Sequence, residues 1–133
     1  MLSSLRLNRK RGGEVMNQVQ LIGRLARDIE MTQTGSKHQV LNNTLAVNRF
    51  VGGEKQTDFI PITAWNATAQ LIDKYLDKGD EIGIVGNLHM NHYTNKDQVE
   101  VYQLEVIIRE VFFLRKKQGD KAVQDINIEV TKV

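Results

Sequence analysis

The sequence predicts an all-β protein, a five-stranded Greek-key barrel with one helix between the third and the fourth strand. Five stretches within residues 17–114 alternate in the period of two that is typical of β-strands. A single stretch, residues 67–78, instead has the apolar spacing of an amphipathic helix. The resulting order (strand, strand, strand, helix, strand, strand) is that of the OB barrel, whereas parallel β–α units would need more helices.

The first strand is expected at residues 17–25 and the second at residues 40–48. Gly23 interrupts the first strand, which predicts a bulge or a sharp bend of the kind that small barrels need. Residues 28–38 are polar, so we expect a loop or a hairpin connection there. Residues 49–51 are expected at the mouth of a loop that continues into a glycine-rich turn.

The third strand, residues 57–65, has two unlike faces. Its core-facing positions are expected to be Ile60, Ile62 and Ala64. The other face carries Phe59, Pro61, Thr63 and Trp65, the only tryptophan of the chain. Aromatic rings on the solvent side of a sheet are candidate stacking platforms for nucleic-acid bases. The alternative is that both faces are buried, one in the barrel and one against a helix or a partner subunit.

The helix is expected over residues 67–78, with Asn66 as its N-cap and Gly79 just past its end. Its apolar stripe, expected to close one end of the barrel, is Leu71, Ile72, Tyr75 and Leu76. A fourth strand is expected at residues 80–93, and residues 98–114 form either one long strand or a pair. One face of the fourth strand would hold Ile82, Ile84, Gly86, Leu88 and Met90. In residues 98–114 the alternating positions are Tyr102, Leu104, Val106 and Ile108.

The composition indicates one globular domain of 133 residues, 41% hydrophobic and 26% charged, without cysteine. No apolar run approaches the ~18 residues of a membrane span, so we expect a cytoplasmic protein without a membrane partner. The chain has 18 basic and 16 acidic residues. Residues 1–15 hold four of the basic and one of the acidic residues, so the rest of the chain has 14 basic and 15 acidic residues. Binding of a polyanion by that near-neutral remainder therefore depends on where its charges lie.

The two ends of the chain are expected to lie outside the barrel, which we assign to residues 16–114. Residues 1–15 are basic and lack a helical or strand period. Residues 11–14 can be encoded by a purine-rich run like a bacterial ribosome-binding site, so we interpret residues 1–15 as a translated leader and Met16 as the natural start. Residues 115–133 are expected to form a short tail; alternation at residues 126–130 leaves a further strand open.

The sequence offers little for catalysis. It contains no cysteine and no glycine-rich phosphate loop, and its acidic residues are scattered. His89 and His92 are three positions apart, which on a strand puts them on opposite faces, so a shared metal ion is not expected. We therefore expect no enzyme, no metal and no cofactor.

Aromatic and cationic residues are interleaved on the expected outer face of the barrel, a combination that suits single-stranded nucleic acid. This set is Arg24, Arg49, Phe50, Phe59, Trp65, His89, Asn91 and Tyr93, to which loops are expected to add Lys37, Lys55 and Lys96. Each stacked base contributes about 1–3 kcal/mol, whichever of the bases it is. The cations would contact the phosphate backbone and make the affinity depend on the salt concentration.

Several motifs, in matching order and spacing, resemble the bacterial and phage single-stranded DNA-binding protein family over residues 16–114. They are Asn17-Gln-Val-Gln-Leu-Ile-Gly-Arg-Leu25, Leu45-Ala-Val-Asn-Arg-Phe50, Thr57-Asp-Phe59, Ala64-Trp65, Tyr75-Leu-Asp-Lys-Gly79, and Ile84-Val-Gly-Asn-Leu88 followed by Tyr93. The resemblance implies an OB fold, a homotetramer, and protection of single-stranded DNA in replication, recombination or repair. It also implies that Phe59, Tyr93 and the Phe50-Val51 pair stack on bases and that Trp65 is a further aromatic contact.

The sequence departs from the family in two ways. His89 and Asn91 stand where the family carries arginines, and Pro61 stands where it often has a basic residue, so the binding face is less cationic. The chain ends at Val133 without the family's Gly/Pro/Gln-rich linker and acidic tip, so we do not expect it to recruit other proteins through such a tail. In this it resembles a phage, plasmid or accessory form.

Two other functions stay open on the sequence alone. An OB module of a primosome or recombination complex would use the aromatic face to hold a partner protein, and the scarcity of cations favours it. An RNA chaperone with the same fold would prefer RNA to DNA.

Overall fold

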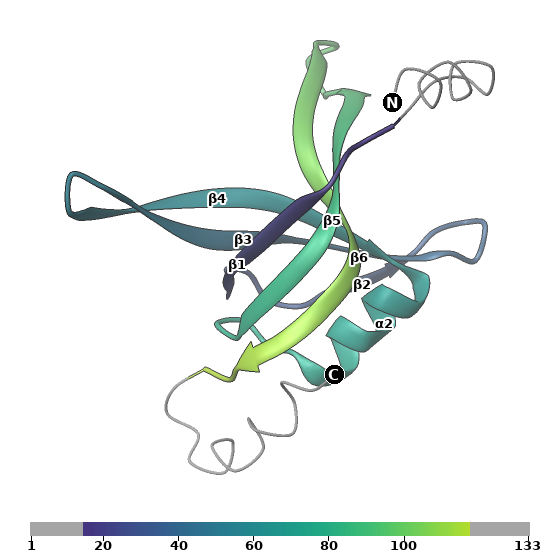
Figure 1. Ribbon diagram of the computed structural model, residues 1–133. Helices are drawn as coiled ribbons and strands as arrows, with labels where there is room; N and C mark the ends of the chain where they lie inside the picture. Colours follow the sequence, from purple (N-terminus) through teal and green to yellow (C-terminus); the bar gives the residue numbers. More distant parts are fainter. Residues whose placement is uncertain (1–14, 118–133) are drawn as a thin grey trace, which may run out of the picture.

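A highly curved sheet, wrapped into a barrel, forms the body of the protein (Figure 1). The computed structural model describes residues 15–117. Its elements are β1 (Val19–Leu25), β2 (Met31–Gln33), β3 (Gln39–Val51), β4 (Glu54–Trp65), α2 (Asn66–Tyr75), β5 (Glu81–Thr94) and β6 (Glu100–Arg115). The segments predicted as leader and tail, residues 1–15 and 115–133, lie almost entirely outside the described residues.

Five strands close the barrel. Neighbouring strands follow the order β1-β5-β6-β4-β3, and β3 pairs back with β1 at Arg24 and Leu25. The β4–β6 pair is parallel, with Ile62 opposite Val106, and the other pairs are antiparallel. The predicted five-stranded barrel, with its helix between the third and fourth of these strands, is therefore confirmed. The short β2 adds to the edge of β3 in the segment predicted as a loop or a hairpin connection.

The core lies inside the barrel and beneath α2. Its fully buried apolar side chains include Leu25, Leu41, Leu45, Ile62, Ala64, Ile82, Ile84 and Val106. The helix closes one end with Ala69 and Ile72, and the following Leu76 completes this contact. Truncating one large core residue to alanine typically destabilises a fold by about 2–5 kcal/mol.

The helix is shorter than predicted and begins differently. It ends at Tyr75 because Leu76 turns to an extended conformation (φ −117°, ψ 154°) and packs into the core. Asn66 does not cap the helix with its side chain: it has φ 49°, and its Oδ1 accepts the N–H of Gln39 at 3.0 Å. Gly79 lies in the turn after the helix, and its N–H donates to the carbonyl of Leu25 at 2.8 Å.

Two glycines mark places where strands cross closely. A Cβ on Gly23 would lie 2.5 Å from the carbonyl oxygen of Ala46, so only glycine lets β1 cross β3. Of the bulge or sharp bend predicted at Gly23, the bulge is wrong, because β1 keeps a regular register with β5 through this residue. The register instead shifts on the β5–β6 pair between Val85 and Gly86, where a Cβ would meet the carbonyl oxygen of Ile107 at 2.1 Å.

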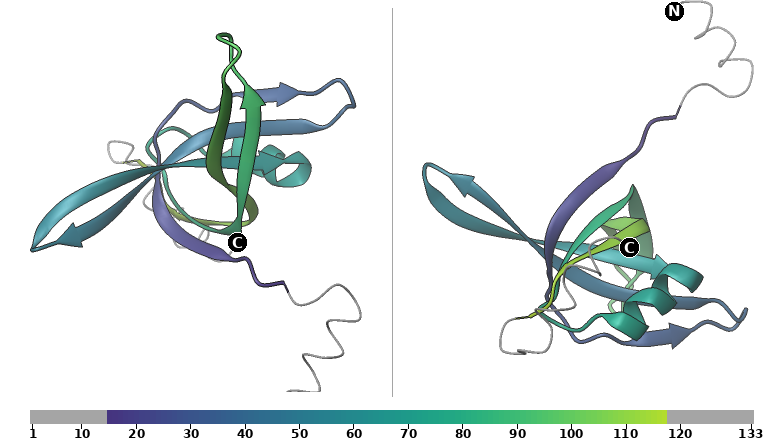
Figure 2. Two further views of the ribbon diagram at one scale, coloured as in Figure 1. Left: turned by 90° about the horizontal axis from the view of Figure 1, so that it is seen from above. Right: turned by 60° about the horizontal axis from the view of Figure 1, so that its bottom comes forward.

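Two hairpins project beyond the barrel (Figure 2). We call residues 47–58 the β3–β4 arm and residues 88–105 the β5–β6 arm. The predicted loop mouth at residues 49–51 is wrong: these residues stay in β3 up to a turn at Gly52 and Gly53. On the other arm Leu88 and Met90 are about half exposed, because the arm has left the barrel that buries Ile82 and Ile84. Within residues 15–117, no helix has the length and apolar character to span a membrane.

Candidate nucleic-acid interface

The two faces of β4 differ as the sequence predicts. Ile62 and Ala64 are buried in the core, whereas the side chains of Phe59 and Trp65 point outward and are 65% and 42% exposed. Thr63 also belongs to the outward face but is only 4% exposed, which the sequence did not predict. Thr63 is covered because its hydroxyl bonds to Glu105 on the neighbouring β6. Within a single chain neither aromatic residue is buried, and burial of this face against a partner subunit stays a prediction.

The register of the β3–β4 arm decides which side chains share a face, since residues directly opposite each other point to the same side. Phe50 lies opposite Lys55, and Phe59 lies opposite Ala46, so these side chains share the outward face of β4. Arg49 and Val51 lie on the reverse face. Arg49 donates there through Nε to Asp58 at 2.8 Å. The structure therefore divides the predicted site: Arg49 and Val51 do not lie on the same surface as Phe50.

The β5–β6 arm brings a second group to the same side of the molecule. His89, Asn91 and Tyr93 alternate on one face of β5, with His89 opposite Glu105. The contact between Thr63 and Glu105 joins this face to the outward face of β4. We call the combined surface the aromatic face and define it by Phe50, Lys55, Phe59, Trp65, His89, Asn91 and Tyr93. It runs from one arm across the β4–β6 seam to the other.

Two further predicted site residues, Arg24 and Lys96, also lie outside the aromatic face. Arg24 is half buried near the turn after α2, where its Nη1 donates to the carbonyl of Gly79 at 3.0 Å, so it supports the barrel end. Lys96 is exposed in the turn at the tip of the β5–β6 arm. The cations of the aromatic face are thus few, as the replacement of the family's arginines predicted.

Glu105 is a member of this surface that the sequence reasoning missed. Its side chain is only 12% exposed and lies 3.0 Å from Nδ1 of His89 through Oε2. The signal in the sequence was a single acidic residue between the apolar Leu104 and Val106, at a position that alternation assigns to the outer face.

The histidines occupy separate places. His92 lies on the reverse face of the β5–β6 arm, stacked on Tyr102 with ring centroids 4.5 Å apart. His89 and His92 therefore face opposite sides, as their spacing predicts. In the part of the chain that the structure describes, no three His, Asp or Glu residues come together as a metal site.

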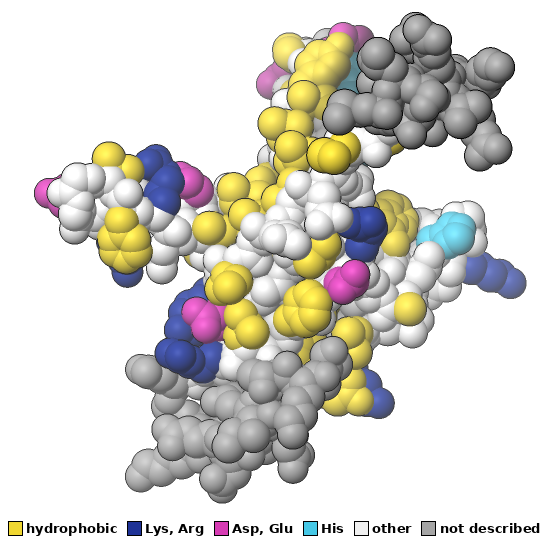
Figure 3. All heavy atoms as spheres, in the orientation of Figure 1, with side chains coloured by type: hydrophobic (Ala, Val, Ile, Leu, Met, Phe, Trp, Pro, Cys, Tyr) yellow, Lys and Arg dark blue, Asp and Glu magenta, His cyan; other side chains and the backbone are white. Residues whose placement is uncertain are grey.

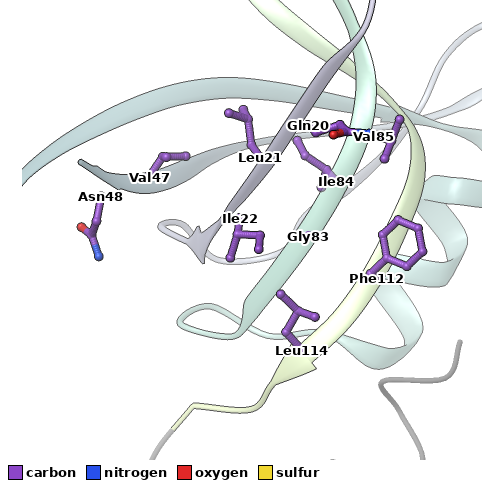
Figure 4. A pocket seen from close by; sticks show the side chains of 10 residues that line it. All are labelled: Gln20, Leu21, Ile22, Val47, Asn48, Gly83, Ile84, Val85, Phe112 and Leu114. Carbon is purple, nitrogen blue, oxygen red and sulfur yellow. The ribbon is translucent and has the colours of Figure 1, made fainter. Parts of the chain in front are cut away.

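A second surface feature lies on the outside of β1, β5 and β6 (Figure 4). It is a shallow, largely apolar groove beside β1, lined by the side chains of Ile22, Phe112 and Leu114 and by the backbone of Gly83. Ile22 is 61% exposed, although it is a large apolar residue. Before Arg24, the edge of β1 that faces β3 carries no partner strand among the residues described here.

The chain is similar to proteins of known kind. The model of the single-strand binding protein family matches residues 16–114. The chain is 39% identical over 115 residues to Single-stranded DNA-binding protein 1 of Staphylococcus aureus (strain MSSA476), covering 84% of this chain and 74% of that protein. It is 36% identical over 111 residues to Single-stranded DNA-binding protein B of Bacillus subtilis (strain 168), covering 81% and 98%. The solved structure of a Plasmodium falciparum SSB complex with ssDNA is similar with a TM-score of 0.69 and 25% identity, covering 76% of this chain and 96% of that chain.

Proposed function

Because the chain belongs to the single-strand binding protein family, we propose that it binds single-stranded DNA regardless of sequence and protects it in replication, recombination or repair. The observation that carries this proposal is the aromatic face, on which Phe50, Phe59, Trp65 and Tyr93 are exposed on one side of the barrel and its arms. Exposed rings of this kind offer π faces to unpaired bases, and every base has one.

In this proposal the protein binds without catalysing a reaction. Bases stack on the rings, each contributing about 1–3 kcal/mol. Lys55 on the β3–β4 arm and Lys96 at the tip of the β5–β6 arm contact phosphates, which makes the affinity fall as salt rises. Since cations are few on the aromatic face, stacking supplies more of the affinity than phosphate contacts do.

We further propose that the protein acts as a homotetramer in the cytoplasm, where bacterial single-stranded DNA lies. The apolar groove beside β1, with the exposed Ile22 and Phe112, supports self-assembly, since exposed apolar patches mark contact surfaces. Several copies would present several aromatic faces to one DNA strand, which raises the effective affinity without new contacts.

A second candidate is a protein-interaction module of a primosome or recombination complex. The observation that favours it is the acidic Glu105 on the aromatic face, which repels phosphates. The four exposed aromatic residues favour DNA instead, so this function takes second place.

The test uses the emission of Trp65, the single tryptophan of the chain. We expect oligo-dT to quench this emission, with an affinity that falls as the salt concentration rises. Oligo-U of equal length and duplex DNA are the controls for an RNA chaperone and for general polyanion binding. Sedimentation with and without oligo-dT reports the assembly in the same samples. No quenching and no gel shift at low salt would contradict the proposal.

A further inference from the structure

One acidic side chain lies within the aromatic face. Glu105 is held between β4 and β5: one carboxylate oxygen accepts the hydroxyl of the buried Thr63, and the other lies 3.0 Å from His89. The carboxamide of Asn42 lies 2.9 Å from the same Thr63 hydroxyl. These two contacts hold the Glu105 carboxylate in the surface. A DNA strand that crosses from one arm to the other therefore passes next to a fixed carboxylate.

His89 is the group that can balance this charge. It lies directly opposite Glu105 in the β5–β6 register, and its side chain is 53% exposed. Histidine is the side chain whose ordinary titration falls between about pH 5 and about pH 8. With His89 neutral the pair carries one negative charge, and with His89 protonated the pair is neutral.

We propose that the Glu105–His89 pair sets the affinity for single-stranded DNA and makes it increase as the pH falls. This inference rests on the proposed function, because it needs the phosphates of the strand to pass over the aromatic face. At higher pH the carboxylate repels these phosphates, and protonation of His89 removes the repulsion.

The other charged groups around the pair do not replace His89. Tyr93 on β5 shares the face of His89. On β6, Arg109 donates through Nη2 to the side chain of Gln18 at 3.1 Å. Of the β4 residues on this face, Phe59, Thr63 and Trp65 carry no charge, and Lys55 lies out on the β3–β4 arm, opposite Phe50. None of these groups is a histidine.

The remaining histidines provide matched controls. His92 faces the reverse side of the β5–β6 arm, where it stacks on Tyr102 and lies 3.6 Å from Glu100. His38 lies in the β2–β3 connection, 3.3 Å from the side chain of Asn66. Each arm-borne histidine thus has an acidic neighbour on β6, but only the pair of His89 and Glu105 lies on the aromatic face.

The experiment measures the affinity of the whole chain for oligo-dT, whose base does not titrate in this interval, at one low salt concentration. Between about pH 8 and about pH 5.5 we expect about five-fold tighter binding per protomer, the size of one charge–charge interaction at about 4 Å in water. His89→Asn is expected to abolish the change, whereas His92→Asn and His38→Asn keep it. At about pH 8, Glu105→Gln is expected to bind about five-fold tighter, and Glu100→Gln is expected to bind like the unaltered protein.

Several results would overturn the inference. They are an affinity independent of pH, a pH dependence that survives His89→Asn, or one that disappears in His92→Asn or His38→Asn. Each of these leaves DNA binding itself intact, whereas no binding at any pH would contradict the proposed function. Thermal unfolding measures whether Glu105→Gln is still folded, which we expect because its amide oxygen can accept the Thr63 hydroxyl. If this variant is unstable, the test depends on His89→Asn, whose side chain is exposed.

Discussion

The two arms are built alike but differ in their second faces. Each is a two-stranded hairpin that presents aromatic residues on the aromatic face. The second face of the β3–β4 arm is polar and carries the exposed Arg49–Asp58 ion pair. The second face of the β5–β6 arm is apolar next to the barrel, with Leu88, Met90 and Leu104 about half exposed, and carries His92 and Glu100 nearer its tip. Figure 3 shows apolar side chains gathered along this arm toward the barrel.

This difference indicates how many partners each arm has. A polar second face is stable in water, so the β3–β4 arm needs a partner for one side only. An apolar second face on a projecting arm is more stable when it is covered, since such patches mark contact surfaces. Under the proposed homotetramer, the β5–β6 arm therefore binds DNA with one face and a neighbouring copy with the other.

The largest expected effect comes from removing the rings of Phe50, on the β3–β4 arm, and of Phe59, at the base of that arm. Phe59→Ala should weaken binding of oligo-dT by about 1–3 kcal/mol per site, and adding Phe50→Ala should increase the loss, because each ring stacks on a base. Both side chains are exposed, so the fold should persist. Val51→Ala, on the reverse face of the same arm, is the matched control and should bind normally. Unchanged affinity in the double variant would show that DNA does not use this face.

A smaller effect is expected from the apolar side of the β5–β6 arm. Leu104→Glu should weaken self-assembly by about 1.5–3 kcal/mol per contact, because burying a leucine side chain contributes that much and a carboxylate resists burial. Sedimentation at a series of protein concentrations measures the change. Gln56→Glu, which adds the same charge to the polar second face of the other arm, is the control. If both variants assemble like the unaltered protein, the arms do not differ in the way we infer.

The sequence predicted the barrel because its signals are local. Alternation along residues 57–65 assigned Ile62 and Ala64 to the core and Phe59 and Trp65 to the outer face, and a strand's own pleat is enough for that. One helical stretch between two groups of strands was enough to identify the topology. The predicted C-terminal end of the helix was wrong because Leu76 is extended and buried, and its burial depends on the folded core.

The sequence did not predict which outer positions are covered, because that depends on where neighbouring strands end. Leu88 and Ile84 lie in the same alternating series, yet Ile84 is buried and Leu88 is half exposed, because only the barrel covers that face. The prediction for Arg49 fails because residues 49–51 form a strand and not a loop, and alternation along that strand turns Arg49 to the reverse face. Glu105 was missed because its partner Thr63 lies 42 residues earlier, across a parallel strand pair.

The smallest expected effect separates the two faces of the β3–β4 arm by charge. Lys55 and Arg49 are both exposed cations on this arm, but Lys55 shares a face with Phe50 and Arg49 is paired with Asp58 on the reverse side. Lys55→Gln should lower the slope of log affinity against log salt by about 0.7, the share of one phosphate contact with a single strand. Arg49→Gln should leave the slope unchanged, since its charge is balanced by Asp58 and points away from the stacked bases. Titrations of oligo-dT at several salt concentrations measure both slopes. Equal losses in the two variants would mean that the strand wraps around the arm and contacts both of its faces.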